Sequence, residues 1–175
     1  MTMQNLQMTG RVWKFGDNVL NDGHITSLEA LKAGNYEAKT LAPYCMTGLD
    51  PDFPKKAAAG DLIVAGKNFG KGQNHITGPL AIKGLGLGVI TQSMTRPFFR
   101  QSVVAGLMMI PFVDGITQFV EQGDVLSVDF RTGRIVNQTQ HTEMCAQPLP
   151  DLMLEFLLAG GEREWLAQHL ASLAA

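Results

Sequence analysis

Residues 66–78 combine glycines with polar side chains in a pattern typical of a small anion-binding site. Gly66, Gly70 and Gly72 allow positive φ angles, so the backbone can come close to a ligand. Backbone amides and side chains of this stretch can donate hydrogen bonds to an anion. The donor side chains are those of Lys67, Asn68, Lys71, Gln73, Asn74, His75 and Thr77. The pattern predicts a site for a negatively charged ligand, and the alternative is a tight turn that binds none.

Two side chains of this stretch could do chemistry as well as binding. An imidazole can accept a proton near neutral pH, so His75 is a candidate base or carboxylate ligand. A lysine supplies a point charge, so Lys71 is a candidate partner for the same anion. The alternatives are a structural histidine at the surface and a lysine that only keeps a loop solvated.

Alternating strands and helices are predicted around the glycine-rich stretch. The apolar run at 62–65 is typical of a strand buried on both faces, as in parallel sheets. A helix is predicted at 79–85, with its amino end directed at the glycine stretch. A strand at 89–91, a helix at 95–105 and a strand at 107–110 follow. This order predicts a parallel α/β core.

The flanking regions predict an antiparallel arm and terminal helices. Residues 11–20 read as an early strand that ends in a turn. Residues 124–139 have the pattern of a β-hairpin with a glycine turn. Asp151 is predicted to cap a helix that runs to residue 158, and a last helix spans 162–173.

The composition narrows the class of protein. The chain has 175 residues, and 14 Lys and Arg against 16 Asp and Glu give a formal charge of -2. We therefore expect one domain over 1–175 and neither nucleic acid nor a membrane as a partner. Cys45 and Cys145 lack the short spacing of metal sites and read as buried small residues. These features predict a reduced, cytoplasmic protein.

Several blocks of sequence, in one order, resemble the small, swivelling-domain subunit of 3-isopropylmalate dehydratase, within the aconitase superfamily. The resemblance covers most of the chain. The blocks are Gly16-Asp17-Asn18-Val19, residues 42–50 with Phe53-Pro54, residues 60–70, then Ser93, Arg96, Phe98, Phe99 and Arg100, the turn at 105–107, and the ending at 149–161.

The resemblance implies a swivelling β/β/α fold and the activity of a hydro-lyase of leucine biosynthesis. In that family the small subunit binds no cofactor, and a 4Fe-4S cluster lies on the large subunit with which it pairs. The substrate would be a small hydroxy di- or tricarboxylate. Matching positions imply that Arg96 lines the cleft and binds the substrate, and that Asp22, which remains from an altered Asp-Thr-Asp motif, contacts the substrate as well. Residues 23–39 correspond to a mobile loop that selects the substrate.

The chain departs from the family at the predicted site. Where relatives carry Gly-x-Gly-Ser-Ser-Arg-Glu-His, residues 70–77 read Gly-Lys-Gly-Gln-Asn-His-Ile-Thr. Gln73 replaces the proton-abstracting serine, and a neutral amide has no usable basicity. His75 replaces the arginine that clamps a carboxylate and is a poorer bidentate partner. The departure predicts new roles for His75 and Lys71.

Two other interpretations remain. One is a non-catalytic, anion-binding module that keeps the fold and forms a homodimer when alone. The other treats Gly84, Gly86 and Gly88 as a dinucleotide fingerprint, but their spacing does not match Gly-x-Gly-x-x-Gly after a strand. These glycines are more simply explained as the end of one helix and the start of the next strand.

Overall fold

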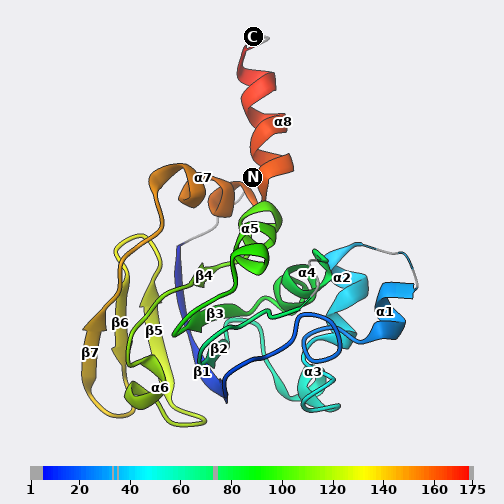
Figure 1. Ribbon diagram of the computed structural model, residues 1–175. Coiled ribbons are helices and arrows are strands. Elements are labelled where there is room, and N and C mark those ends of the chain that lie inside the picture. The colour runs from blue at the N-terminus through cyan, green and yellow to red at the C-terminus, as the bar shows by residue number, and fades with distance from the viewer. Residues whose placement is uncertain (1–5, 33, 35, 73–74, 174–175) are drawn as a thin grey trace.

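Seven strands form one mixed sheet in the part of the chain that the computed structural model describes, residues 6–32, 34, 36–72 and 75–173. Their order across the sheet is β4-β3-β2-β1-β5-β6-β7. The strands are β1 (Gln7–Phe15), β2 (Leu62–Ala65), β3 (Gly88–Thr91), β4 (Met109–Ile110), β5 (Val125–Asp129), β6 (Arg134–Asn137) and β7 (Thr142–Cys145). Figure 1 shows β5, β6 and β7 on one side of the molecule and helices α1 to α4 on the other.

Strand β1 joins the parallel and antiparallel halves of the sheet. It pairs in parallel with β2, where Val12 faces Leu62, and antiparallel with β5, where Met8 faces Val128. Strands β2, β3 and β4 continue the parallel half. All four residues of β2 are buried, as an uninterrupted apolar run in a doubly covered strand requires. The predicted parallel core with an antiparallel arm is therefore confirmed.

The antiparallel arm is larger than the predicted hairpin. Strands β5 and β6 pair around Gly133, which has a φ of 76°, and β7 adds a third strand. The sequence analysis missed β7 because its residues are mostly exposed and show no apolar alternation. Backbone hydrogen bonds to β6 hold this edge strand in place. Strand β1 also begins earlier than predicted, at Gln7, because its first half pairs with β5.

Helices of ordinary length occur where the sequence predicts them, as do short helical turns within 27–32 and 41–45, while some single turns occur where none is predicted. The helices are α1 (Leu28–Lys32), α2 (Ala38–Leu41), the 3-10 helix η1 (Ala42–Tyr44), α3 (Phe53–Lys56), α4 (Thr77–Gly84), α5 (Arg96–Ala105), α6 (Ile116–Phe119), α7 (Asp151–Ala159) and α8 (Glu162–Leu173). Turns as short as α2, α3 and α6 carry too few residues to show a helical period. Helix α8 extends away from the sheet (Figure 1). Among the described helices, none combines the length and the apolar character that crossing a membrane requires.

The predicted cap of α7 is wrong. Asp151 is the first helical residue, and Pro150 occupies the N-cap position without a side-chain hydrogen bond. Pro150 has an extended backbone, with φ −56° and ψ 149°, and such a conformation suits an N-cap residue. Gly160 ends the helix in the left-handed conformation, as the sequence predicts.

A buried carboxylate fixes the start of β2 against β1. Asp61 is 6% exposed and accepts hydrogen bonds from the amide of Arg11 at 3.0 Å, from Trp13 Nε1 at 2.8 Å and from the amide of Ala58 at 3.0 Å. Burial alone would raise the pKa of Asp61, but these hydrogen bonds and the Arg11 guanidinium hold that pKa below its ordinary value. The fold therefore stabilises the ionised form of Asp61.

A close approach of two helix ends leads to a first prediction. Gly106 ends α5 with a φ of 67°, and a Cβ atom there would lie 2.5 Å from Gly160 C and Gly161 N. Gly106→Ala is expected to lower the free energy of unfolding by about 2–4 kcal/mol, because it adds left-handed strain and a clash with backbone atoms. Urea titration measures the change. The matched control is Gly123→Ala, where φ is 89° but nothing lies within 4 Å of the new Cβ. Equal losses in the two variants would show that the helix contact contributes nothing.

Candidate active site

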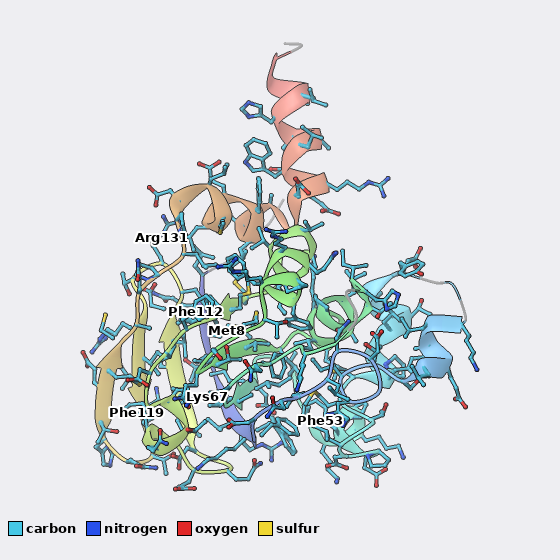
Figure 2. All side chains as sticks on the ribbon, viewed as in Figure 1. Met8, Phe53, Lys67, Phe112, Phe119 and Arg131 are labelled. Carbon is cyan, nitrogen blue, oxygen red and sulfur yellow. The ribbon has the colours of Figure 1, made fainter. Side chains whose placement is uncertain are left out.

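Three segments that follow parallel strands meet at one edge of the sheet. The stretch after β2 pairs with the segment after β1 through Asn18 N to Lys67 O, at 2.7 Å, and Asn21 N to Lys71 O, at 2.8 Å. It pairs with the segment after β3 through Phe69 N to Ser93 O, at 3.0 Å. Lys67 lies at this edge, where β1 also ends, between the antiparallel arm and the helices (Figure 2). Carboxyl ends of parallel strands are where α/β proteins bind ligands.

Most of the backbone donors of the glycine stretch are used within the protein. The amide of Lys67 donates to Asp17 Oδ1 at 2.7 Å, and the amide of Asn68 donates to Ser93 Oγ at 3.0 Å. The amides of Phe69 and Lys71 donate to the carbonyl oxygens of Ser93 and Val19. An amide that already donates to the protein cannot also hold a ligand strongly. These four amides are therefore not available to an anion, and the side chains of the stretch remain the candidate donors.

The glycines of the stretch differ in what surrounds them. Gly70 has a φ of 75°, and a Cβ there would collide with the ring of Phe98, so this glycine permits close packing. A Cβ at Gly66 would collide with the carboxylate of Asp17. Gly72 has a φ of 104° and faces open space at the surface. For Gly66 and Gly70 the structural interpretation is sufficient, while Gly72 leaves room for a ligand.

His75 and Asp22, which the sequence analysis singled out separately, contact each other. His75 Nδ1 lies 2.7 Å from Asp22 Oδ2. The side chain of Asp22 is 12% exposed, and that of His75 is 41% exposed. The carboxylate is thus the inner member of the pair, and the imidazole is the member that a ligand can reach.

A buried amide holds this pair in place. Asn21 is 1% exposed, and its Nδ2 donates to Asp22 Oδ1 at 3.0 Å and to the carbonyl oxygen of His75 at 2.9 Å. A Cβ at Gly78 would collide with Asn21 Oδ1, so glycine at the start of α4 leaves space for that amide. The sequence analysis did not identify Asn21, although it lies between Leu20 and Asp22 in the altered motif.

Two further asparagines connect the loop after β1 with the loop after β2. The sequence analysis did not identify them as a pair. Asn18 and Asn68 both have left-handed backbones, with φ of 58° and 57°, and Asn68 Nδ2 donates to Asn18 Oδ1 at 3.2 Å. Asparagine is among the few residues that accept this conformation readily. The signal available in the sequence was an asparagine in each of two turn-forming segments.

The predicted cationic residues lie on the same loop edge. Lys71 is exposed, and its backbone is fixed by hydrogen bonds to Val19 and Asn21. Arg96 is exposed at the first position of α5, directly after Thr95, whose Oγ1 donates to the carbonyl oxygen of Gly70 at 2.8 Å. Both side chains can therefore contribute positive charge beside the glycine stretch.

One predicted binding residue differs from this picture, and two others are not described. Thr77 is fully buried, and its hydroxyl lies 3.5 Å from that of Thr26, so it faces the interior and not the surface. Gln73 and Asn74 lie outside the described residues. Their predicted contribution to binding stays a prediction.

The segment predicted to select the substrate is partly built into the core. Ile25 and Thr26 are fully buried, and Thr26 O accepts a hydrogen bond from the amide of Gly23 at 2.7 Å. Leu28 on α1 and Tyr36 are exposed, at 60% and 53%. The described part of residues 23–39 thus combines an anchored start with exposed apolar side chains, and its mobility stays a prediction.

The cysteines do not form a site. Cys45 is fully buried, and burial raises the pKa of its thiol, so the reactive thiolate is disfavoured. Cys145 is exposed on the edge strand β7, which contradicts the prediction that both cysteines are buried. The prediction was wrong because an edge strand leaves its side chains open to solvent. Among the described residues, no group of three or more His, Cys, Asp and Glu side chains could hold a metal ion.

Comparison with known proteins gives a consistent result. No family model matches the chain. The chain is similar to the isopropylmalate/citramalate isomerase small subunit of Methanocaldococcus jannaschii, with 42% identity over 93% of this chain and 95% of the relative. It is 40% identical to the 3-isopropylmalate dehydratase small subunit of Syntrophus aciditrophicus, over 95% and 97%. A crystal structure of 3-isopropylmalate dehydratase from M. jannaschii superposes with a TM-score of 0.87 at 32% identity, over 96% and 98% of the two chains.

Proposed function

The chain belongs to the family of 3-isopropylmalate dehydratase small subunits, and from this premise we propose that it is the small subunit of a hydro-lyase. It acts with a large subunit on a small hydroxy di- or tricarboxylate, as a 3-isopropylmalate-like step of leucine biosynthesis would require. The observation that carries the proposal is identity of 36–42% to curated small subunits over most of their length. The free thiol of Cys45 fits a reducing cytoplasm.

The geometry of the loop edge supports a carboxylate substrate. Lys71 and Arg96 are exposed beside the glycine stretch and supply positive charge. A guanidinium can bind a carboxylate through two parallel hydrogen bonds, while an ammonium acts as a point charge. Arg96 thus takes over the clamp that the family places at the position of His75, and Lys71 adds attraction. The exposed, uncrowded Gly72 leaves room for the ligand.

His75 is the base in this proposal. It takes a proton from the carbon beside the one that carries the hydroxyl group. The electron pair of the broken carbon–hydrogen bond becomes the second bond between the two carbons, and the hydroxyl group leaves from its carbon. In the hydration direction, His75 returns the proton. The exposed imidazole of His75 can reach a substrate, whereas Gln73 as an amide has no basicity.

The resemblance implies an iron-sulfur cluster on the large subunit and none on this chain. The described residues contain no group of His, Cys, Asp and Glu side chains suited to a metal, and the two cysteines lie one in the core and one on the edge strand. We assign the 4Fe-4S cluster to the large subunit. The small chain contributes the proton transfer and the carboxylate contacts.

Co-expression with a large-subunit homologue from the same source tests the proposed function. We expect a stable complex that changes the absorbance of at least one substrate in a panel of hydroxy di- and tricarboxylates. Each subunit alone should be inactive, because each lacks part of the site. Purified complex with an intact cluster but no absorbance change for any substrate would refute the proposal.

The altered motif favours one second candidate, a carboxylate-binding module without activity. Its supporting observation is that residues 73 and 75 carry neither the serine base nor the arginine clamp of the family. It predicts that the chain alone, as a stable homodimer, binds a di- or tricarboxylate in calorimetry, while the reconstituted complex shows no turnover. Turnover in that complex would exclude this candidate.

A further inference from the structure

The contact between Asp22 and His75 does more than join two loops. Ion pairs with a solvent-exposed member typically contribute little to stability, so this contact, whose imidazole is 41% exposed, adds little to holding the two loops together. The arrangement is also asymmetric, because the acid is 12% exposed and the ring is not. A largely enclosed carboxylate behind a more exposed imidazole is the geometry that orients a histidine for proton transfer.

The oxygens of Asp22 are occupied by the protein itself. Oδ2 lies 2.7 Å from His75 Nδ1, and Oδ1 accepts a hydrogen bond from Asn21 Nδ2 at 3.0 Å. A carboxylate placed this way would also repel a carboxylate substrate at short range. Asp22 is therefore poorly suited to the substrate contact that the resemblance implies.

The contact decides where the imidazole carries its proton. An ionised carboxylate can only accept hydrogen bonds, so Nδ1 of His75 must be the protonated nitrogen. In the neutral ring, Nε2 then holds the free electron pair. The imidazole is 41% exposed, so this nitrogen is the one left for a substrate.

Neighbouring buried groups hold the segments that carry Asp22 and His75 against each other. Asn21 donates through one Nδ2 group to both Asp22 Oδ1 and His75 O, which fixes the acid and the backbone of the base together. Gly78 leaves the space for Asn21, and the buried contact between Thr26 and Thr77 joins the two segments one turn further on. Buried groups thus hold the carboxylate of Asp22 and the backbone of His75.

Resting on the proposed function, we infer that Asp22 is a positioning residue for His75. It holds the Nδ1 proton, so that Nε2 takes the substrate proton, and it offsets the positive charge of the imidazolium that forms. No proton passes to Asp22, and the ring returns to neutral when Nε2 gives its proton back during hydration. Asp22 contacts neither the substrate nor the departing hydroxyl group.

Kinetics of the complex with the large subunit separate this role from substrate binding. Asp22→Asn is expected to lower kcat by about 10²-fold, with KM nearly unchanged, because the orientation of the base and the charge that offsets its imidazolium are lost while the substrate contacts stay. The double variant Asp22→Asn with His75→Gln should be no slower than His75→Gln alone, since the acid acts through the ring. Asp52→Asn, at an exposed carboxylate on α3's N-cap, is the control and should leave both constants unchanged.

Three outcomes would overturn the inference. A raised KM with unchanged kcat in Asp22→Asn would make Asp22 a substrate ligand. Additive losses in the double variant would show that the acid acts independently of His75. A wild-type complex without turnover on the substrate panel would refute both the proposed function and this role. That outcome differs from the other two because it appears in the wild type, before any variant is measured.

A spectroscopic measurement on the chain alone tests the geometry without activity. Long-range ¹H–¹⁵N spectra of the chain labelled at histidine report which ring nitrogen carries the proton. We expect the neutral ring of His75 to carry it on Nδ1 in the wild type and in Asp52→Asn. In Asp22→Ala it should move largely to Nε2, which the isolated imidazole ring favours. A wild-type ring protonated at Nε2 would overturn the inference even if the complex is active.

Discussion

His75→Gln in the complex with the large subunit is expected to lower kcat by about 10²–10⁴-fold, the usual contribution of a general acid–base group. Glutamine keeps the length of the side chain and a hydrogen-bonding group near the position of Nε2. Its amide cannot accept a proton, so binding survives and proton removal does not. Steady-state kinetics with the preferred substrate of the panel measure both constants. The expected pattern is a large fall in kcat with a smaller change in KM.

The matched control for this variant is His141→Gln. His141 lies in the turn between β6 and β7, on the antiparallel arm. It should leave kcat unchanged, which shows that losing a histidine as such is harmless. If His75→Gln kept full kcat while KM rose, His75 would be a carboxylate ligand, and another residue would have to act as the base.

Asp61→Ala is expected to lower the free energy of unfolding by about 2–4 kcal/mol at neutral pH. The substitution leaves Trp13 Nε1 and the amides of Arg11 and Ala58 without their acceptor at a site that is 6% exposed. Buried donors without partners cost more than the hydrogen bonds contribute. Urea unfolding of the chain alone, followed by circular dichroism, measures the loss.

The same carboxylate predicts how the loss depends on pH. The fold lowers the pKa of Asp61 from its ordinary value of 3.8, so the unfolded chain binds a proton at a higher pH than the folded chain. Stability from Asp61 is complete above that ordinary value and is lost as the pH falls through the folded pKa. The difference between wild type and Asp61→Ala should therefore shrink below about pH 4. A difference that stays constant down to about pH 2 would show that the charge of Asp61 contributes nothing.

The matched control for Asp61 is Asp52→Ala. Asp52 pairs with Lys55 at 2.9 Å, but both side chains are exposed, at 57% and 80%. An exposed pair of this kind contributes little to stability, so the variant should unfold almost like the wild type. A loss at Asp52 as large as that at Asp61 would mean that burial of the carboxylate does not matter.

Much of the fold could be predicted from local sequence patterns. The apolar run of β2 and the glycine stops of α5 and α7 were readable because each depends on a few neighbouring residues. Strand β7 and the single turns α2, α3 and α6 were missed because their own sequence shows no apolar period, and β7 is held by its pairing with the neighbouring strand β6. Similar limits explain the error at Cys145, whose exposure depends on the strand being at the edge of the sheet.

Only part of the candidate site could be predicted from the sequence. The residue types of Lys71, His75 and Arg96 could be identified from the loop and from the family blocks. The use of the loop amides within the protein could not, because their acceptors lie 20 or more residues away on other segments. The prediction that the backbone itself would cradle an anion therefore gave way to binding through side chains.

By itself, the sequence determined the parallel core, the position of the glycine stretch after β2 and membership of the dehydratase small-subunit family. These follow from short-range periodicity, from residues with special backbone needs, and from blocks of similar sequence. Only the tertiary structure decided that Asp22 contacts His75, 53 positions further on, and that Asp61 holds β1. Such contacts depend on which strand ends meet when parallel strands pair, and no local pattern encodes which distant polar groups will then lie within hydrogen-bonding distance.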